Sequence, residues 1–239
     1  MQNFDELDNR NNMQVNEKRT FIEQEDRNGF IKKVYGIVFV QLIVTVFITA
    51  LPMFSSGALT FMVSNPSLVG LALVAAIVIE IALLCCRQLS RTVPTNYYLL
   101  GAFTICMGYC VANICTLYDP VSVFSSALMT AGAVGGLTYY AWTTKEDFTI
   151  MRGLYSLLFS VLFLTIIMSF FLYSQIMSLF ISVLFVLIFG VYLIVDTQMI
   201  IGSKRYELSD EDYVLGALII YLDIINLFLE ILKIFGKRD

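Results

Sequence analysis

The chain has 239 residues, of which 58% are hydrophobic and 14% are charged, and its formal net charge is −4. A soluble domain is nearer to about half apolar and about a quarter charged, so a mean hydropathy of +0.79 excludes an ordinary soluble domain and indicates an integral membrane protein. The absence of a basic patch excludes nucleic-acid binding, and the absence of His excludes imidazole-based metal sites and catalytic triads.

Residues 1–30 are polar and rich in Asn, Asp, Glu and Arg. They contain too few apolar residues to form a core, so we expect a disordered cytosolic tail. No cleavable signal peptide precedes the first apolar run, which then has to act as the insertion signal. Residues 31–239 are expected to form a single membrane domain, because none of their linkers is long enough to separate two domains.

Apolar runs of membrane-spanning length fill that domain. A spanning helix needs about 20 residues, and short connections with breakers such as Asn65-Pro66 and Asp119-Pro120 separate the runs. The sequence therefore predicts an all-α integral membrane protein, a bundle of seven transmembrane helices over residues 34–54, 68–86, 96–115, 121–142, 153–173, 176–201 and 213–235.

Basic residues lie before the first run and after every second run: Arg27, Lys32, Lys33, Arg87, Arg91, Lys145, Arg152, Lys204 and Arg205. The intervening loops contain no Lys or Arg. Because Lys and Arg favour the cytosolic side, the N-terminus is predicted to be cytosolic. Lys237 and Arg238 follow the seventh run and break this alternation, so that run either crosses as a central helix or re-enters from the cytosol. A crossing is favoured, since about 23 residues suffice.

Two aspartates lie where a bilayer disfavours charge. Asp196 is in VYLIVDTQMIIG of the sixth run, and Asp223 is in ALIIYLDIINLFLEIL of the seventh. An acid at membrane depth is costly and is a candidate functional group. The two helices are sequential and joined by a short loop, so they are expected to be neighbours and their carboxyl groups to be able to meet.

Two carboxyl groups that meet in a low dielectric cannot both ionise cheaply, so we expect them to share one proton and to titrate as a unit. Protonated, the pair would be a hydrogen-bonded latch between helices. Deprotonated, it would repel itself and offer oxygen ligands to a hard cation such as Ca²⁺. The alternative is an interhelical hydrogen bond that only holds the bundle together.

Further polar groups accompany this pair on the seventh helix. Asn226 and Glu230 share a stripe with Asp223, and Lys233 is placed to neutralise Glu230. Ser209 is predicted to cap the helix, with Asp212 at its third position.

Glu80 is a buried acid of the second run, followed by Arg87 and Arg91 at helical-repeat multiples. Either arginine could pair with an inner carboxylate. The alternative is that both only extend to the cytosolic edge of the membrane.

These residues resemble the Bax-inhibitor or lifeguard family (transmembrane Bax inhibitor motif proteins) over about residues 30–236. The likeness rests on FIKKVYGIVFVQLIVT in the first run, CC in the second, TKEDFT after the fourth, VYLIVDTQMIIG in the sixth and YVLGALIIYLDIINLFLEILKIFG in the last. It is strongest to the Golgi anti-apoptotic branch. The resemblance implies a seven-helix bundle whose last helix is central and wrapped by the others.

The resemblance also implies a pH-sensitive Ca²⁺ leak through the Golgi or endoplasmic reticulum membrane, which lowers store Ca²⁺ and suppresses apoptosis. By the same resemblance, Asp196 and Asp223 form the proton-sensitive gate and the candidate Ca²⁺ site. Arg91 matches the arginine that latches onto the pair, and Arg87 competes for that role. The candidate modulators are Glu80, Asn226 and Glu230.

A second hypothesis is a non-conducting membrane adaptor or structural subunit that modulates cell death through apoptosis regulators or other Ca²⁺ channels. Nucleotide-binding loops, zinc motifs and catalytic triads are missing from the sequence, so we do not expect an enzyme. No cofactor is expected besides Ca²⁺ as a permeating or bound ion, and membrane lipids are the other expected partners.

Overall fold

The computed structural model describes residues 2–150, 158, 160, 161, 163–165, 167, 174–202 and 208–238, with side chains from residue 24 onward except those of 150 and 175. The described elements are helices: α1 (Gln2–Phe54), α2 (Ser56–Ser64), α3 (Pro66–Cys85), α4 (Arg87–Arg91), α5 (Thr95–Cys115), α6 (Pro120–Thr143), the 3-10 turn η1 (Phe148–Ile150), α8 (Gln175–Ile201) and α9 (Tyr213–Phe235). The only β contact within the described ranges is an isolated bridge between Tyr118 and Arg238.

Six of these helices are long and apolar enough to cross a membrane, namely α1, α3, α5, α6, α8 and α9. They coincide with six of the predicted runs, so the all-helical membrane fold is confirmed. The predicted span 153–173 lies mostly outside the described residues, as do Arg152, Lys204 and Arg205. The count of seven therefore stays a prediction.

Local sequence signals set several helix ends. The Asp119 carboxylate accepts hydrogen bonds from the backbone N–H groups of Val121 and Ser122, at 3.1 and 3.3 Å, and so caps α6. Pro120 occupies the first helical position, where a missing N–H costs nothing. Gly202 follows α8 with φ 75°, a conformation that glycine adopts without steric cost, and it ends that helix.

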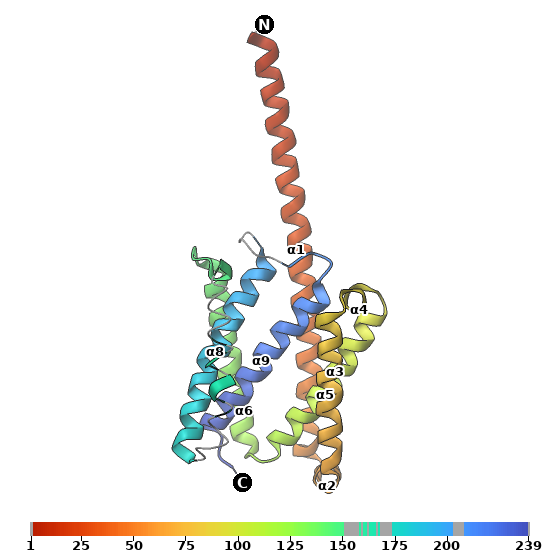
Figure 1. The fold of residues 1–239 in the computed structure, drawn as a ribbon, viewed down its shortest axis with the longest axis vertical. Coiled ribbons are helices and arrows are strands. Elements are labelled where there is room, and N and C mark those ends of the chain that lie inside the picture. The colour runs from red at the N-terminus through yellow and green to blue at the C-terminus, as the bar shows by residue number, and fades with distance from the viewer. Residues whose placement is uncertain are drawn as a thin grey trace.

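The N-terminal segment continues α1 as a helix that projects beyond the bundle (Figure 1). The disorder and the cytosolic position expected of residues 1–30 stay predictions. The segment contains Glu, Gln, Arg and Met, all of which favour helix locally. The first side chains of α1 that are buried, within the described part from residue 24, are Phe30 and Ile31. The division into a tail and a membrane domain near residue 30 remains a prediction.

The last helix, α9, is the most enclosed of the six spans. Within its apolar window 72% is buried inside the bundle, against 44% for α5 and less for the others. It packs against α8, α1 and α6, and in Figure 1 it lies between α8 on one side and α1 on the other. Gly216 permits one close approach, since a Cβ there would lie 3.3 Å from the Val34 side chain. A helix that is apolar on nearly all faces is stable in such a position.

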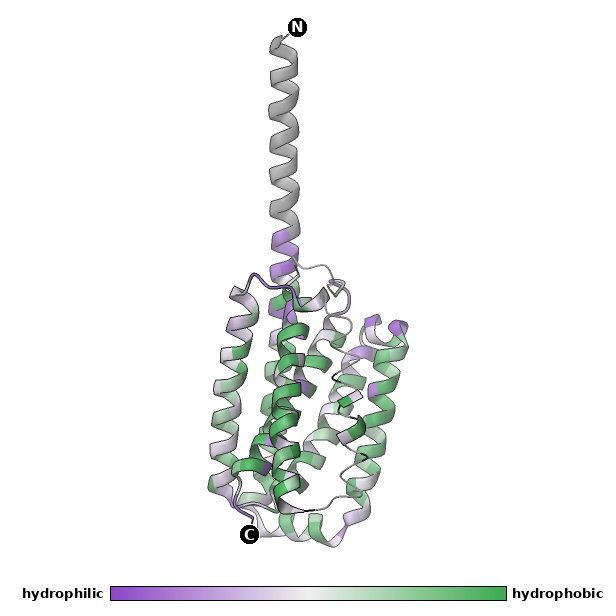
Figure 2. Ribbon diagram, turned by 60° about the vertical axis from the view of Figure 1, so that its left-hand side comes forward, coloured by the Kyte–Doolittle hydropathy of each residue, from purple (hydrophilic) through white to green (hydrophobic). Residues whose placement is uncertain are grey.

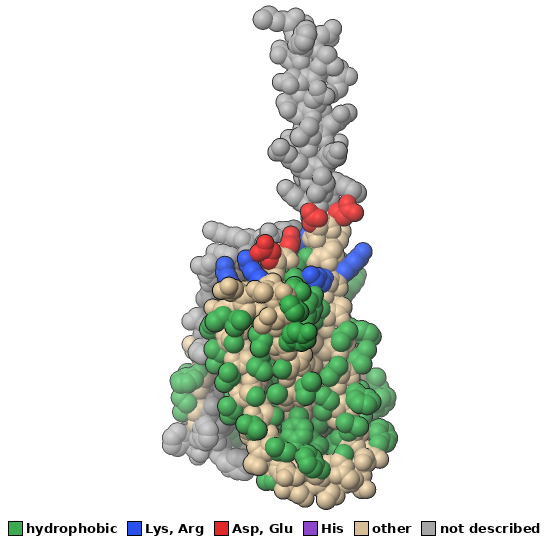
Figure 3. All heavy atoms as spheres, turned by 90° about the vertical axis from the view of Figure 1, so that its right-hand side faces the viewer, with side chains coloured by type: hydrophobic (Ala, Val, Ile, Leu, Met, Phe, Trp, Pro, Cys, Tyr) green, Lys and Arg blue, Asp and Glu red, His purple; other side chains and the backbone are tan. Residues whose placement is uncertain are grey.

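The two ends of the bundle differ in charge. At the end where α1 enters, which we call the α1-entry end, Lys33 lies over the ring of Tyr213 with 3.3 Å from Nζ to the ring centre. The charged side chains in Figure 3 gather there, while the flanks are apolar. Figure 2 shows the same apolar character on the bundle helices. This distribution suits helices set in hydrocarbon with charged groups at the interface.

At the opposite end, the backbone N–H of Asp119 donates to the carbonyl of Lys237 at 2.9 Å. The last helix therefore runs through the whole bundle as one continuous element, from Tyr213 at the α1-entry end to the C-terminus at the other end (Figure 1). A re-entrant segment would have returned to the end at which it started.

Candidate functional site

Asp196 on α8 and Asp223 on α9 meet inside the bundle. Each residue is only 6% exposed, and a side-chain hydrogen bond joins the two carboxyl groups. An ionised carboxylate can only accept hydrogen bonds, so a bond between two of them requires a proton on one partner. Oδ2 of Asp223 is buried without a hydrogen-bond partner. Two buried carboxyl groups placed in this way can hold one proton between them.

Helix tilt brings the two aspartates to one level. Asp223 lies ten residues into α9, about 15 Å along its axis, whereas Asp196 lies five residues before the end of α8, about 8 Å from it. If the axes of α8 and α9 were both perpendicular to the membrane plane, these two positions would lie at different depths. In Figure 1, α9 runs obliquely across α8, and a tilt of this kind reduces the depth reached per residue.

Each residue of the Asp196-Thr197-Gln198 motif binds a different element. Asp196 contacts α9, as described above. Oγ1 of Thr197 accepts a hydrogen bond of 3.5 Å from the Tyr35 hydroxyl of α1. Consecutive helical side chains point about 100° apart, so three in a row can reach three neighbours.

Gln198 completes this motif by holding the chain after α6. Its Nε2 donates to the carbonyl oxygen of Glu146 at 2.9 Å, and its Oε1 accepts from the backbone N–H of Phe148 at 2.9 Å. The Gln198 side chain is almost wholly buried. Sequence analysis assigned no role to Thr197 or Gln198. The signal that marks them is a run of three polar residues inside an otherwise apolar segment.

Arg27 caps the C-terminal end of α8 with hydrogen bonds. Its guanidinium group donates to the carbonyl oxygens of Met199 at 2.6 Å and Ile201 at 3.3 Å. It also donates to the carbonyl of Leu208 at 2.6 Å and pairs with Asp210 at 3.0 Å. The last carbonyls of a helix lack partners within the helix, and a cation there interacts favourably with the helix dipole. Arg27 was predicted only as an orientation signal, yet it ties α1 to α8.

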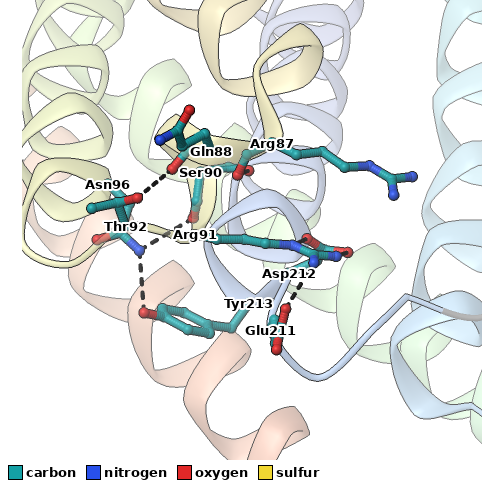
Figure 4. A network of polar contacts seen from close by, with 9 residues as sticks. All are labelled: Arg87, Gln88, Ser90, Arg91, Thr92, Asn96, Glu211, Asp212 and Tyr213. Carbon is teal, nitrogen blue, oxygen red and sulfur yellow. Dashed lines mark hydrogen bonds and ion pairs between the residues drawn. The ribbon is translucent and has the colours of Figure 1, made fainter.

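Arg91, the candidate latch, contacts the residues that precede α9 (Figure 4). Nε and Nη2 donate to the two carboxylate oxygens of Asp212 at 2.7 and 2.9 Å, and Nη1 donates to Glu211 at 2.7 Å. Hydrogen bonding to Asp212 raises the pKa of Arg91. Arg87 is exposed and points away from this cluster in Figure 4. A latch on the aspartate pair thus remains a prediction for both arginines, and neither makes that contact in this structure.

The pairing with Arg91 also changes where α9 begins. The predicted cap at Ser209 is wrong: the helix begins at Tyr213, and Asp212 precedes it without a side-chain capping bond. The Asp212 carboxylate is engaged by the guanidinium group and is not available to the backbone of the first turn. The Tyr213 hydroxyl accepts a hydrogen bond of 3.1 Å from Asn96, which also donates to the carbonyl of Ser90 (Figure 4).

The candidate modulators differ in burial and in their contacts. Glu230 is buried and accepts a hydrogen bond of 2.6 Å from Nζ of Lys233, so the expected neutralising contact is present. Asn226 and Glu80 are both half-buried. Glu80 forms no ion pair with Arg87 or Arg91. Asp223 and Glu230 are seven residues apart, about 10 Å along α9.

The two carboxylates of the aspartate pair do not by themselves complete a Ca²⁺ site. Ca²⁺ takes six to eight oxygen ligands, and two carboxylates supply at most four. Within the described ranges, no group of three or more Cys, Asp or Glu side chains is placed to hold a metal ion. A cation that contacts the pair would have to keep part of its hydration shell.

The fold and the site define a helical membrane protein whose central helix carries a buried acid. A model of the family described as "Inhibitor of apoptosis-promoting Bax1" matches residues 27–239. Human protein lifeguard 3 is 34% identical over 221 residues, covering 91% of this chain and 71% of the relative. Mouse protein lifeguard 4 is 36% identical over 208 residues, covering 87% and 84%. The chain therefore belongs to the Bax inhibitor or lifeguard family of anti-apoptotic membrane proteins, as the resemblance predicted.

Proposed function

We propose that this protein is a proton-sensitive cation leak that passes Ca²⁺ across an intracellular membrane, with Asp196 and Asp223 as its gate. The observation that carries the proposal is the hydrogen bond between these two buried carboxyl groups, which join the central helix to its neighbour. A proton is the simplest ligand that can hold such a pair together. Its loss leaves two like charges in a water-poor interior.

The size of that repulsion is sufficient for gating. Two unit charges 4 Å apart repel by about 4 kcal/mol at an effective dielectric constant of about 20. A difference of about 4 kcal/mol shifts a two-state equilibrium by close to a thousandfold. Protonation therefore favours the joined, closed arrangement, and deprotonation favours separation of α8 from α9 and attracts cations to the exposed oxygens.

The contacts at the α1-entry end confine the movement. Arg27 fastens the end of α8 to α1, and Arg91 fastens the residues before α9 to α4. These contacts would hold the ends of α8 and α9 in place while the two helices separate at Asp196 and Asp223. The alternating basic residues of the sequence support a cytosolic N-terminus, which puts this end on the cytosolic face of the Golgi or endoplasmic reticulum membrane. Release of stored Ca²⁺ would then account for suppression of apoptosis.

Ca²⁺ efflux from reconstituted vesicles tests the proposal. The wild-type protein should release Ca²⁺ in a manner that depends on pH, whereas Asp196→Asn and Asp223→Asn should flatten the response, because an amide does not ionise. Glu25→Gln is the control, since Glu25 is an exposed acid on the projecting part of α1. Wild-type pH dependence in both asparagine variants would remove the gate from the aspartate pair.

The adaptor hypothesis is favoured by one feature, the helix that projects beyond the bundle. Deleting residues 1–23 separates the two hypotheses, because the deletion leaves Arg27 and its contacts in place. An adaptor would lose anti-apoptotic activity on this deletion and keep it in the Asp196→Asn, Asp223→Asn double variant. A leak gated by the aspartates would show the reverse pattern.

A further inference from the structure

A groove of about 490 Å³ opens on the outer surface of the bundle between α1 and α5. Ligand sites commonly measure about 300–1,000 Å³. Its walls are aliphatic, with Ile37 and Val40 on α1 and Leu100 and Ile105 on α5. The groove faces outward from the bundle, which for a membrane protein means toward lipid.

Two glycines on facing helices create the open space. A Cβ atom added at Gly36 or at Gly101 would meet no heavy atom within 4 Å. Both glycines line the groove and are exposed. A larger residue at either position would project into the trough rather than into the protein.

One end of the groove is basic. Lys32 and Lys33 line it and are exposed. Lys32 forms no ion pair within the part of the chain that the structure describes. Three acids of this end are paired, Asp210 with Arg27 and both Glu211 and Asp212 with Arg91. The exposed acids Glu25 and Asp26 lie at least six residues before Lys32, about 9 Å further along α1. The two lysines are the charged residues that line the groove, and they place positive charge at the mouth of its apolar walls.

The dimensions of the groove match one leaflet of a bilayer. The lining runs along α1 from Lys32 to Val44, about 18 Å of helix. Half of a hydrocarbon core of about 30 Å is about 15 Å. A lipid with its headgroup at the lysines would therefore have its chain alongside the trough, ending near the middle of the membrane.

We propose that this groove binds an anionic phospholipid, with the phosphate at Lys32 and Lys33 and one acyl chain packed between Gly36 and Gly101. Basic pockets between transmembrane helices bind anionic headgroups by this combination of charge and apolar surface. The lipid headgroup would contact Lys32 on α1, five residues after Arg27, which binds the carbonyl of Met199 near the end of α8.

Native mass spectrometry of the full-length protein tests this proposal. The protein is extracted from nanodiscs of phosphatidylcholine alone or of phosphatidylcholine with a minor fraction of phosphatidylserine. The wild-type protein should retain one phosphatidylserine and no comparable phosphatidylcholine. Gly36→Leu and Gly101→Leu should each abolish retention. Lys32→Gln and Lys33→Gln should each weaken retention by about fivefold, and the double variant Lys32→Arg, Lys33→Arg should retain lipid as the wild-type protein does.

Matched controls separate groove filling from general damage. Gly70→Leu on α3 and Gly135→Leu on α6 also place the new side chain in open space, since a Cβ at either meets nothing within 4 Å, but outside the groove. Lys145→Gln removes an exposed lysine after α6. These variants should retain lipid as the wild-type protein does. Leucine has a higher helix propensity than glycine, so these substitutions should not weaken the helices. Circular dichroism checks that every variant is folded.

Two results would overturn the proposal. The first is equal retention of phosphatidylcholine and phosphatidylserine by the wild-type protein, which would remove the anionic headgroup. The second is loss of lipid on Lys32→Gln, Lys33→Gln substitution together with normal retention in both leucine variants. That combination would mean that the lysines attract the lipid headgroup and that no acyl chain occupies the groove.

Discussion

The guanidinium group of Arg27 donates a 2.6 Å hydrogen bond to the carbonyl oxygen of Met199, which lies three residues, or about one helical turn, beyond Asp196. This contact joins the first helix of the bundle to the helix that carries half of the aspartate pair. It places a cation at the negative end of the α8 dipole, where the backbone carbonyls have no partners of their own. The position of Asp196 therefore depends on a residue far from it in sequence.

Replacing Arg27 should destabilise the bundle. Arg27→Ala removes several charge-assisted hydrogen bonds from a side chain that is only 15% exposed, so we expect the free energy of unfolding to fall by about 2 kcal/mol. Thermal unfolding in detergent measures the change. Arg27→Lys should recover only part of it, because an ammonium group lacks the planar fork that reaches several carbonyls. Lys237→Ala, at an exposed cation of the other end, should leave stability unchanged; an equal loss in both would argue against a specific cap.

The contribution of Arg91 should not vary with pH near neutrality. Its pKa is raised by the hydrogen bond to Asp212. A cation whose pKa is higher in the folded state contributes stability fully below its unfolded pKa and loses it only as the pH rises through the folded value. Arg91→Gln should therefore lower the melting temperature equally at about pH 5 and about pH 8. An effect at only one of these pH values would show that the contact of Arg91 with Asp212 is itself the proton sensor.

Gln198 should control the order of the chain after α6. Gln198→Ala leaves the backbone N–H of Phe148 and the carbonyl of Glu146 without their side-chain partner, at a cost of about 1–3 kcal/mol. Hydrogen–deuterium exchange at residues 144–150 should become faster. Gln88→Ala, at an exposed glutamine of α4, serves as the control. Unchanged protection in the Gln198 variant would mean that other contacts hold this segment.

Much of the fold was predictable because a bilayer imposes a simple rule on sequence. Six predicted spans coincide with helices, and the central place of α9 follows from its being apolar on nearly all faces while carrying acids that must avoid lipid. The approach of Asp196 and Asp223 was foreseeable from two acids on sequential helices. Their common level was not, because it depends on a tilt that spacing along a helix does not contain.

The roles of the arginines lay beyond sequence reasoning for a related reason. A long flexible side chain reaches whichever partner the tertiary fold brings near, so charge near a span end predicts orientation but not contact. Arg27 reaches α8, and Arg91 reaches Asp212. The contact between Arg91 and Asp212 also explains the wrong prediction at Ser209. The local sequence fits a capping motif, but the Asp212 carboxylate binds Arg91 and the helix begins at Tyr213.

The most direct test of the gate is the distance between the carboxyl groups of Asp196 and Asp223, determined in structures of the wild-type protein at low and at high pH. We expect carboxyl oxygens within hydrogen-bonding distance at low pH, and separated carboxylates with α8 displaced from α9 at high pH. Oxygen atoms that remain hydrogen-bonded at both values would contradict this expectation.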